Sequence, residues 1–219
     1  MTDVLMYAGP TLHRARKIAP HLSLDGIRVL PPIERGILPR LRGATPGTLI
    51  LVDGMFHQTL SVGHAEIRTM LLAGWRVWGL SSMGAIRARE MMHMGMRGYG
   101  TVFERYCRED LDVRDDEVTL LHQGEPPYVE MSEPLCHLQL AIEDAVTRGV
   151  VSRADGDAVL GELSAMWYGD RTLALFEAQL RARAGERAGE VAAIVRDFDR
   201  WRSKAHDLIA FLEERPWAK

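Results

Sequence analysis

The stretch that decides the fold is a β-rich run that ends in small residues and continues as a helix, Arg76-Val77-Trp78-Gly79-Leu80-Ser81-Ser82-Met83-Gly84-Ala85. Three similar β-rich runs precede it, at residues 4–7, 27–30 and 48–52, and glycine or proline follows each of them. The segments between the runs include helical spacing of apolar residues, and such βα alternation is typical of a parallel sheet with helices on its faces. We therefore predict an α/β fold, with a Rossmann-like parallel sheet flanked by helices in the N-terminal half.

The second half of the chain has a different pattern. Two short strands joined by a loop are expected at residues 117–122 and 128–131. After Ser132 the sequence turns helical, which predicts helices at about 134–148, 152–166, 172–184 and 187–214. No glycine-serine linker separates the halves. We therefore expect an α/β core over residues 1–133 and a mainly helical region over residues 134–219, packed on the core as one continuous unit.

Length and composition exclude several classes of protein. The 219 residues suit one large domain or one domain with a helical extension, and 47% apolar beside 26% charged residues is typical of a globular chain. A formal net charge of −3 lacks the basic surplus of nucleic-acid-binding proteins. No apolar run approaches the roughly 18 residues that span a membrane, and the N-terminus lacks a signal-peptide pattern. We expect a cytoplasmic protein with neither nucleic-acid nor membrane partners.

The cysteines and histidines give no sign of a metal or disulfide site. Cys107 and Cys136 fit neither a disulfide framework nor a CxxC motif. The eight histidines form no metal-binding motif. We expect two reduced thiols, no metal and no cofactor.

Ser82 is the candidate nucleophile. In an open parallel sheet, ligands bind at the carboxyl end of the sheet, where the strands stop. The turn after the run at residues 76–80 places a serine there, beside the backbone N–H groups of Met83 and Gly84, which could stabilise an oxyanion. The spacing differs by one residue from the Gly-x-Ser-x-Gly elbow of hydrolases. The competing interpretation is that Ser82 only caps the following helix, a position that serine favours.

Lys204 is the candidate base for this serine. The chain has 24 arginines but only three lysines, and a desolvated lysine can lose its proton whereas arginine cannot. Lys204 falls at the border of the apolar stripe of the last predicted helix, where its amine could reach a cleft. The simpler interpretation is an amphipathic lysine that extends from a packed helix into water.

Several short motifs occur in the order in which TfuA-like proteins have them. They are Gly9-Pro10, residues 32–36, Asp53-Gly54, residues 64–67, 79–88 and 95–100, Asp115-Asp116-Glu117 and Ser132-Glu133-Pro134. The chain resembles TfuA-like proteins from residue 8 to about residue 140, and more weakly as far as Asp207. Ala65 stands where the family commonly has a basic residue.

The resemblance implies an accessory role in peptide backbone thioamidation beside a YcaO enzyme, which activates the amide with ATP. It implies that the chain releases sulfide by hydrolysing the C-terminal thiocarboxylate of a ubiquitin-fold sulfur carrier, and assists binding of the precursor peptide. The family's Ser-Lys pair matches Ser82 and Lys204. The alternative is a non-catalytic adaptor that docks on a YcaO enzyme and presents peptide or carrier.

Further residues are candidates for binding the substrate, here the carrier's tail: Asp53, Gly54, His64, Glu66 and Arg87. For Asp53, capping of a loop is the simpler interpretation. The acidic run Asp115-Asp116-Glu117 is a candidate contact for the YcaO partner through charge steering, although a solvated turn is the commoner role of such a run.

Overall fold

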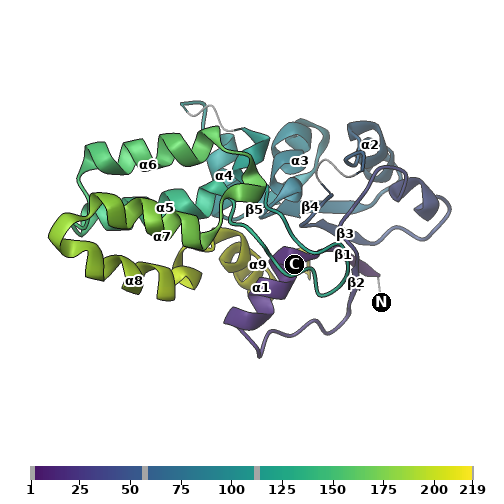
Figure 1. Cartoon of the computed structure of the whole chain (residues 1–219). Helices are drawn as coiled ribbons and strands as arrows, with labels where there is room; N and C mark the ends of the chain where they lie inside the picture. Colours follow the sequence, from purple (N-terminus) through teal and green to yellow (C-terminus); the bar gives the residue numbers. More distant parts are fainter. Residues whose placement is uncertain (1–2, 56–58, 111–113, 219) are drawn as a thin grey trace. The chain divides into compact units, whose positions relative to one another are not determined.

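Five short strands form one parallel sheet among the residues that the structure, a computed structural model, describes, namely 3–55, 59–110 and 114–218. The order across the sheet is β2-β1-β3-β4-β5 (Figure 1). The strands are β1 (Val4–Tyr7), β2 (Ile27–Leu30), β3 (Thr48–Leu51), β4 (Arg76–Leu80) and β5 (Arg97–Tyr99). The predicted α/β fold with a parallel sheet is confirmed. β5 is a strand that the sequence analysis did not predict, because its three residues contain no apolar run.

Helices cover both faces of the sheet, as Figure 1 shows. On one face lie α2 (His64–Leu72) and α3 (Met83–Met91), and on the other lie α1 (Pro10–Ile18) and α9 (Ser203–Glu214). The strands are apolar on both sides because each face carries its own core. The helix after β1 and the helix after β3 cover opposite faces, so the topological switch point lies between these two strands.

The sheet belongs to the first of two units into which the chain divides. This unit comprises Met1–Asp115, Pro126–Tyr128 and Lys204–Lys219, and the second comprises Asp116–Glu125 and Val129–Ser203. The helix α4 (Thr101–Cys107) follows β5 in the first unit. The expected division at residue 133 stays a prediction. No described helix is long and apolar enough to cross a bilayer.

The second unit is built from helices that run alongside one another in Figure 1. They are α5 (Leu135–Thr147), α6 (Arg153–Ala165), α7 (Leu173–Arg183) and α8 (Ala188–Arg196). Ser152 and Thr172 begin α6 and α7 by accepting hydrogen bonds from backbone N–H groups of the first turn. The side chains of Leu138, Phe176 and Ile194 are buried in the core between these helices. The mainly helical second half is therefore confirmed.

Short 3-10 segments connect these elements. They are Leu38–Leu41, Met92–Met94, Asp115–Glu117, Tyr168–Asp170, Gly185–Arg187, Phe198–Trp201 and Pro216–Ala218.

Two expectations for the second half are wrong. The single helix over residues 187–214 is divided into α8, the 3-10 segment Phe198–Trp201 and α9. Phe198 belongs to the core of the second unit and Leu208 to that of the first, so the apolar stripe serves two cores. The strands at residues 117–122 and 128–131 reduce to one isolated bridge between His122 and Glu130.

Candidate active site

The turn between β4 and α3 places two serines at the carboxyl end of the sheet. Ser81 has a φ of 64°, in the left-handed region that residues other than glycine seldom adopt. The backbone N–H of Ser82 donates to the Leu80 carbonyl at 2.7 Å, which closes a turn around Ser81. A strand that enters a helix through such a strained serine resembles the nucleophile elbow of hydrolases in its geometry.

Two glycines allow α3 to begin directly against the sheet. A Cβ atom on Gly84 would lie 1.8 Å from the Leu51 carbonyl oxygen, and one on Gly79 would lie 2.1 Å from the Gly84 carbonyl oxygen. The Gly84 N–H also donates to the Val52 carbonyl at 3.1 Å. The first turn of α3 is thereby held against β3 and β4, and Ser82 is held with it.

The hydroxyl of Ser82 does not cap α3. Ser82 occupies the N-cap position, but its side chain makes no capping hydrogen bond, and none to any other described residue. Its exposed fraction is 3%. The interpretation of Ser82 as only a helix cap therefore lacks the contact that defines a cap.

Ser81 is the second serine of this turn, and the sequence reasoning passed over it. Its Oγ is buried and has no hydrogen-bond partner in the described part of the chain. The signal that could have identified it is Gly79-Leu80-Ser81, which matches the first three positions of Gly-x-Ser-x-Gly.

The two backbone N–H groups predicted to stabilise an oxyanion, those of Met83 and Gly84, differ in whether they already donate a hydrogen bond. The Gly84 N–H is engaged by the Val52 carbonyl. The Met83 N–H, at the first position of α3, has no hydrogen-bond partner among the described residues. The Met83 amide is therefore the donor available beside Ser82 in this conformation.

Lys204 also lies at the carboxyl end of the sheet. One turn after it on α9, the Asp207 carboxylate accepts hydrogen bonds from the backbone N–H groups of Thr101 (2.8 Å) and Val102 (2.9 Å), just after β5. Because β5 pairs with β4, this contact holds the start of α9 near the end of the strand that leads to Ser82. The Lys204 side chain is 3% exposed, so it does not extend into water. The fold thus brings both members of the predicted pair, buried, to the same end of the sheet.

The surroundings of Asp207 also affect its protonation. Burial raises the pKa of Asp207 above its ordinary 3.8, while the hydrogen bonds from Val102 and Thr101 act in the opposite direction. Burial therefore disfavours the charged form of this carboxylate, and its hydrogen bonds favour it.

The Asp53 carboxylate, which follows β3, binds the start of α1 on the other side of the switch point. Its carboxylate accepts hydrogen bonds from the Gly9 N–H (2.8 Å), the Thr11 N–H (3.0 Å) and the Thr11 hydroxyl (2.6 Å). This is the capping role that the sequence offered as the simpler interpretation. The adjacent Gly54 lies against the Met83 side chain, because a Cβ atom there would be 2.2 Å from its sulfur.

His64 and Arg87 share one acidic partner on α3, while Glu66 on α2 makes separate contacts. His64 Nε2 lies 2.8 Å from the Glu90 carboxylate, to which Arg87 also donates at 2.6 Å. Glu66 accepts from the backbone N–H groups of Gly36 and Gly63. The structure brings His64 and Arg87 together at Glu90, which the sequence did not reveal, whereas the contacts of Glu66 are with the backbone of Gly36 and Gly63.

A comparison with protein families identifies the family, and the matched residues include the turn at Ser82. A model of the TfuA-like protein family matches residues 53–172, more than half of the chain. The chain belongs to the TfuA-like family. TfuA-like proteins are associated with YcaO enzymes, and the family suggests an accessory role in thioamidation. A comparison with curated proteins gives no match.

The match covers only part of the TfuA-like site. Asp53, Ser82 and Arg87 lie within the matched residues, whereas Lys204 lies beyond them. The placement of Lys204 therefore rests on the fold, through α9 and Asp207. In this TfuA-like chain Cys107 and Cys136 are not joined in a disulfide. No group of three potential metal ligands occurs among the residues outside the gaps at 56–58 and 111–113 and the ends of the chain.

Proposed function

We propose that this TfuA-like protein hydrolyses the C-terminal thiocarboxylate of a ubiquitin-fold sulfur carrier, supplies the sulfide to a YcaO enzyme and assists binding of the precursor peptide. The observation that carries the proposal is the Ser82 hydroxyl, which caps nothing and lies at the same end of the sheet as the buried Lys204. A buried lysine near a serine is a recognised way to activate that serine as a nucleophile.

The proposed reaction has two steps. Ser82 Oγ attacks the thiocarboxylate carbon while its proton passes to the Lys204 amine, and the Met83 N–H stabilises the oxyanion; the Gly84 N–H joins it only after leaving the Val52 carbonyl. The C–S bond then breaks, and the sulfur leaves as hydrosulfide with the proton that Lys204 returns, while the carrier is held as an ester on Ser82. Water attacks this ester and gives a proton to the neutral Lys204 amine, which passes it to Ser82 Oγ as the ester bond breaks; the carrier leaves as a carboxylate and the second proton of the water goes to solvent. The sequence consumes one water and needs no oxidant or reductant.

The proposed contacts to the carrier's tail are of two kinds. His64 offers a hydrogen-bond donor on the surface and Arg87 a partly buried one, and both are held in place by Glu90. Asp53, Gly54 and Glu66 act through the backbone that they hold: Asp53 fixes α1, Gly54 admits Met83, and Glu66 fixes the loop before α2.

The competing function is a non-catalytic adaptor that presents peptide or carrier to a YcaO enzyme. The purified chain should release sulfide from a thiocarboxylated carrier in the absence of any YcaO protein. Absence of sulfide in that assay, with a carrier shown to be thiocarboxylated, would establish the adaptor instead.

The nucleophile is tested by two neighbouring variants. Ser82→Ala should abolish sulfide release and leave the fold intact, because alanine removes one oxygen that makes no hydrogen bond. Ser81→Gly is the matched control and should keep the activity, because glycine adopts a left-handed φ without strain. Loss of activity in Ser81→Gly together with full activity in Ser82→Ala would transfer the nucleophile to Ser81.

A further inference from the structure

The edge strand β2 has backbone groups that no other strand uses. β2 pairs only with β1 in the described sheet, and the Leu30 carbonyl accepts from the Ala8 N–H at 3.1 Å. Backbone groups alternate in direction along a strand, so the N–H and C=O of Val29 point away from β1. The Val29 side chain is also 38% exposed. Such an edge is a template for one more strand.

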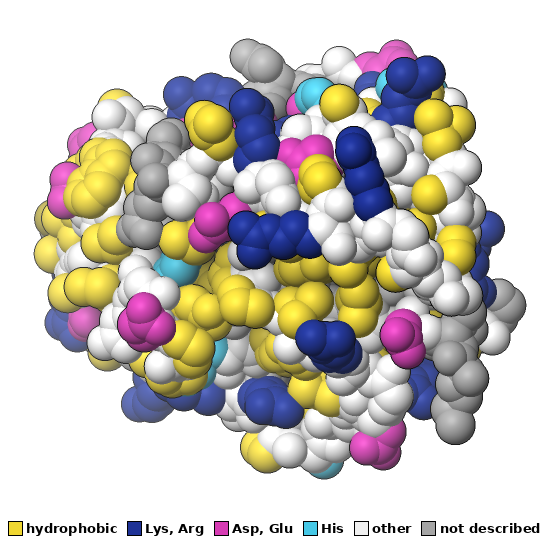
Figure 2. Space-filling view, turned by 90° about the vertical axis from the view of Figure 1, so that its right-hand side faces the viewer, with side chains coloured by type: hydrophobic (Ala, Val, Ile, Leu, Met, Phe, Trp, Pro, Cys, Tyr) yellow, Lys and Arg dark blue, Asp and Glu magenta, His cyan; other side chains and the backbone are white. Residues whose placement is uncertain are grey.

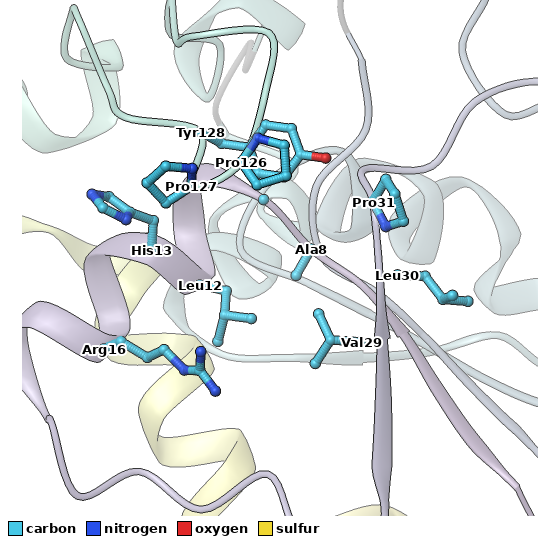
Figure 3. Close-up of a pocket in the computed structure, with 11 residues that line it drawn as sticks. Ala8, Leu12, His13, Arg16, Val29, Leu30, Pro31, Pro126, Pro127 and Tyr128 are labelled. Atoms are coloured by element: carbon cyan, nitrogen blue, oxygen red, sulfur yellow. The ribbon is translucent and has the colours of Figure 1, made fainter.

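A cavity of about 380 Å³ lies beside this edge, between β2 and α1. In Figure 3, Leu12 and Arg16 project from α1 on the side that faces Val29, while Pro126, Pro127 and Tyr128 close the other end. Figure 2 shows a face on which hydrophobic side chains gather near the middle, with Lys and Arg side chains among and around them. Walls of this kind suit an apolar side chain.

The one charged side chain among the described residues that line the cavity indicates the charge of the ligand. Arg16 lines it, and no aspartate or glutamate does. Within the described chain Arg16 has no ion pair or hydrogen bond. A guanidinium without a partner beside an apolar cavity favours a carboxylate attached to an apolar group.

From these three features we infer that an extended segment of the precursor peptide adds to the sheet along β2, places an apolar side chain in the cavity and sets a carboxylate against Arg16. The peptide C=O and N–H groups pair with those of Val29, as in other complexes in which a peptide extends a sheet. This inference rests on the part of the proposed function that gives the chain a role in peptide binding.

The probe is a fluorescent eight-residue peptide of alternating valine and threonine that ends in a free carboxylate, and binding is measured by anisotropy. Val29→Pro should weaken binding at least about tenfold, because proline removes the outward N–H and leaves the ladder to β1 intact. Arg16→Gln should weaken binding by about 10–100-fold, as expected for loss of a hydrogen bond to a charged group. Amidation of the peptide's carboxylate should have the same effect on the unchanged protein.

Matched controls separate these effects from general ones. Val29→Thr keeps the N–H and the β-branched shape, and Lys17→Gln removes a positive charge from the same helix without altering the cavity; both should bind like the unchanged protein. A probe methylated on its backbone nitrogens should bind weakly, which tests strand pairing without changing the protein. Wild-type binding by Val29→Pro or by the methylated probe would overturn the inference, as would equal effects of Arg16→Gln and Lys17→Gln.

The same variants distinguish this inference from the proposed hydrolysis. Val29→Pro should release sulfide from the carrier at the normal rate. A wild-type protein that binds the probe but releases no sulfide would refute the hydrolysis and leave the peptide site standing, and the opposite result would refute the peptide site alone.

Discussion

Ser81 and Ser82 adjoin each other in backbone conformations of opposite sign, with φ of 64° and −128°. A left-handed conformation costs a residue other than glycine about 1–2 kcal/mol, and such strain collects at functional sites. The close packing of Gly79 and Gly84 holds the turn in place. The strain therefore supports this turn as the functional part of the sheet.

At Lys204, exchange for arginine keeps a long basic side chain and removes the ability to act as a base. If Lys204 accepts the Ser82 proton, Lys204→Arg should lower the rate of sulfide release about 10²–10⁴-fold, which is the range for loss of general-base catalysis. The measurement is single-turnover sulfide release by a variant whose circular dichroism matches the wild type. A full rate would transfer the role of base to another residue, with His64 tested next.

At Asp53, exchange for asparagine removes the charge from a buried capping site. Asp53→Asn should lower the free energy of unfolding by roughly 1–3 kcal/mol, because the N–H groups of Gly9 and Thr11 lose a charged acceptor. Urea denaturation measures this change. Asp157→Asn is an exposed control and should stay within about 0.5 kcal/mol of the wild type. Loss of sulfide release without loss of stability would instead assign Asp53 to the substrate.

Among the elements, the end of α6 depends on one buried arginine. Arg171 is fully buried; its Nε donates to the Leu163 carbonyl at 2.9 Å, and Nη2 donates to the Asp116 carboxylate at 2.7 Å and to the Met166 carbonyl at 3.1 Å. The Leu163 carbonyl also accepts from the Met166 N–H, whereas the Met166 carbonyl receives its hydrogen bond from Arg171. The second unit is fastened at this point by a guanidinium whose shape lysine cannot reproduce.

Arg171→Lys should lower the free energy of unfolding by roughly 2–4 kcal/mol, because one buried ammonium cannot pair with the Asp116 carboxylate and reach the Leu163 and Met166 carbonyls at the same time. The matched control is Arg181→Lys, whose exposed ion pair with Glu177 on α7 contributes only about 0.3–0.5 kcal/mol. Thermal or urea unfolding distinguishes the two. Equal small effects would show that Arg171 is replaceable.

Elements with a continuous apolar run could be predicted from the sequence, and those without one could not. β1, β3 and β4 are buried on both faces, so their runs stand out, whereas β5 was missed because it is short and contains glycine. The break between α8 and α9 was missed because the apolar stripe continues through it, although it serves two cores. Periodicity shows burial, but not the core in which a residue is buried.

The sequence predicted where along the chain the candidate site lies, but it did not predict the contacts that the site residues make. The turn at Ser82 was identified because small residues follow a buried strand. The left-handed φ of Ser81 and the bond from the Gly84 amide to Val52 depend on backbone geometry that residue types do not encode. The placement of Lys204 depends on Asp207, which reaches residues more than a hundred positions earlier in the chain.

On the scale of the whole molecule, the acidic run at residues 115–117 is only partly exposed to solvent. Asp116 pairs with Arg171 and Glu117 is buried, so Asp115 is the exposed member of the run. If the run steers a YcaO partner, Asp115→Lys should weaken association several-fold at low salt and reduce its salt dependence, while sulfide release from the carrier survives. Binding measured at two ionic strengths tests this. Unchanged affinity and salt slope would place the interface elsewhere.

The chain returns to the first unit at Lys204. During synthesis on the ribosome, the first unit can therefore finish folding only after the second unit has been made. Residues 129–203 of the second unit emerge before α9 does. The sheet face that carries Ile50, Trp78 and Leu80 is therefore not fully covered until α9 has been made, because Leu208 and Phe211 of α9 complete the core on that face. Part of this apolar face stays uncovered in a nascent chain up to that point. The unit that is begun first is thus the last to be finished.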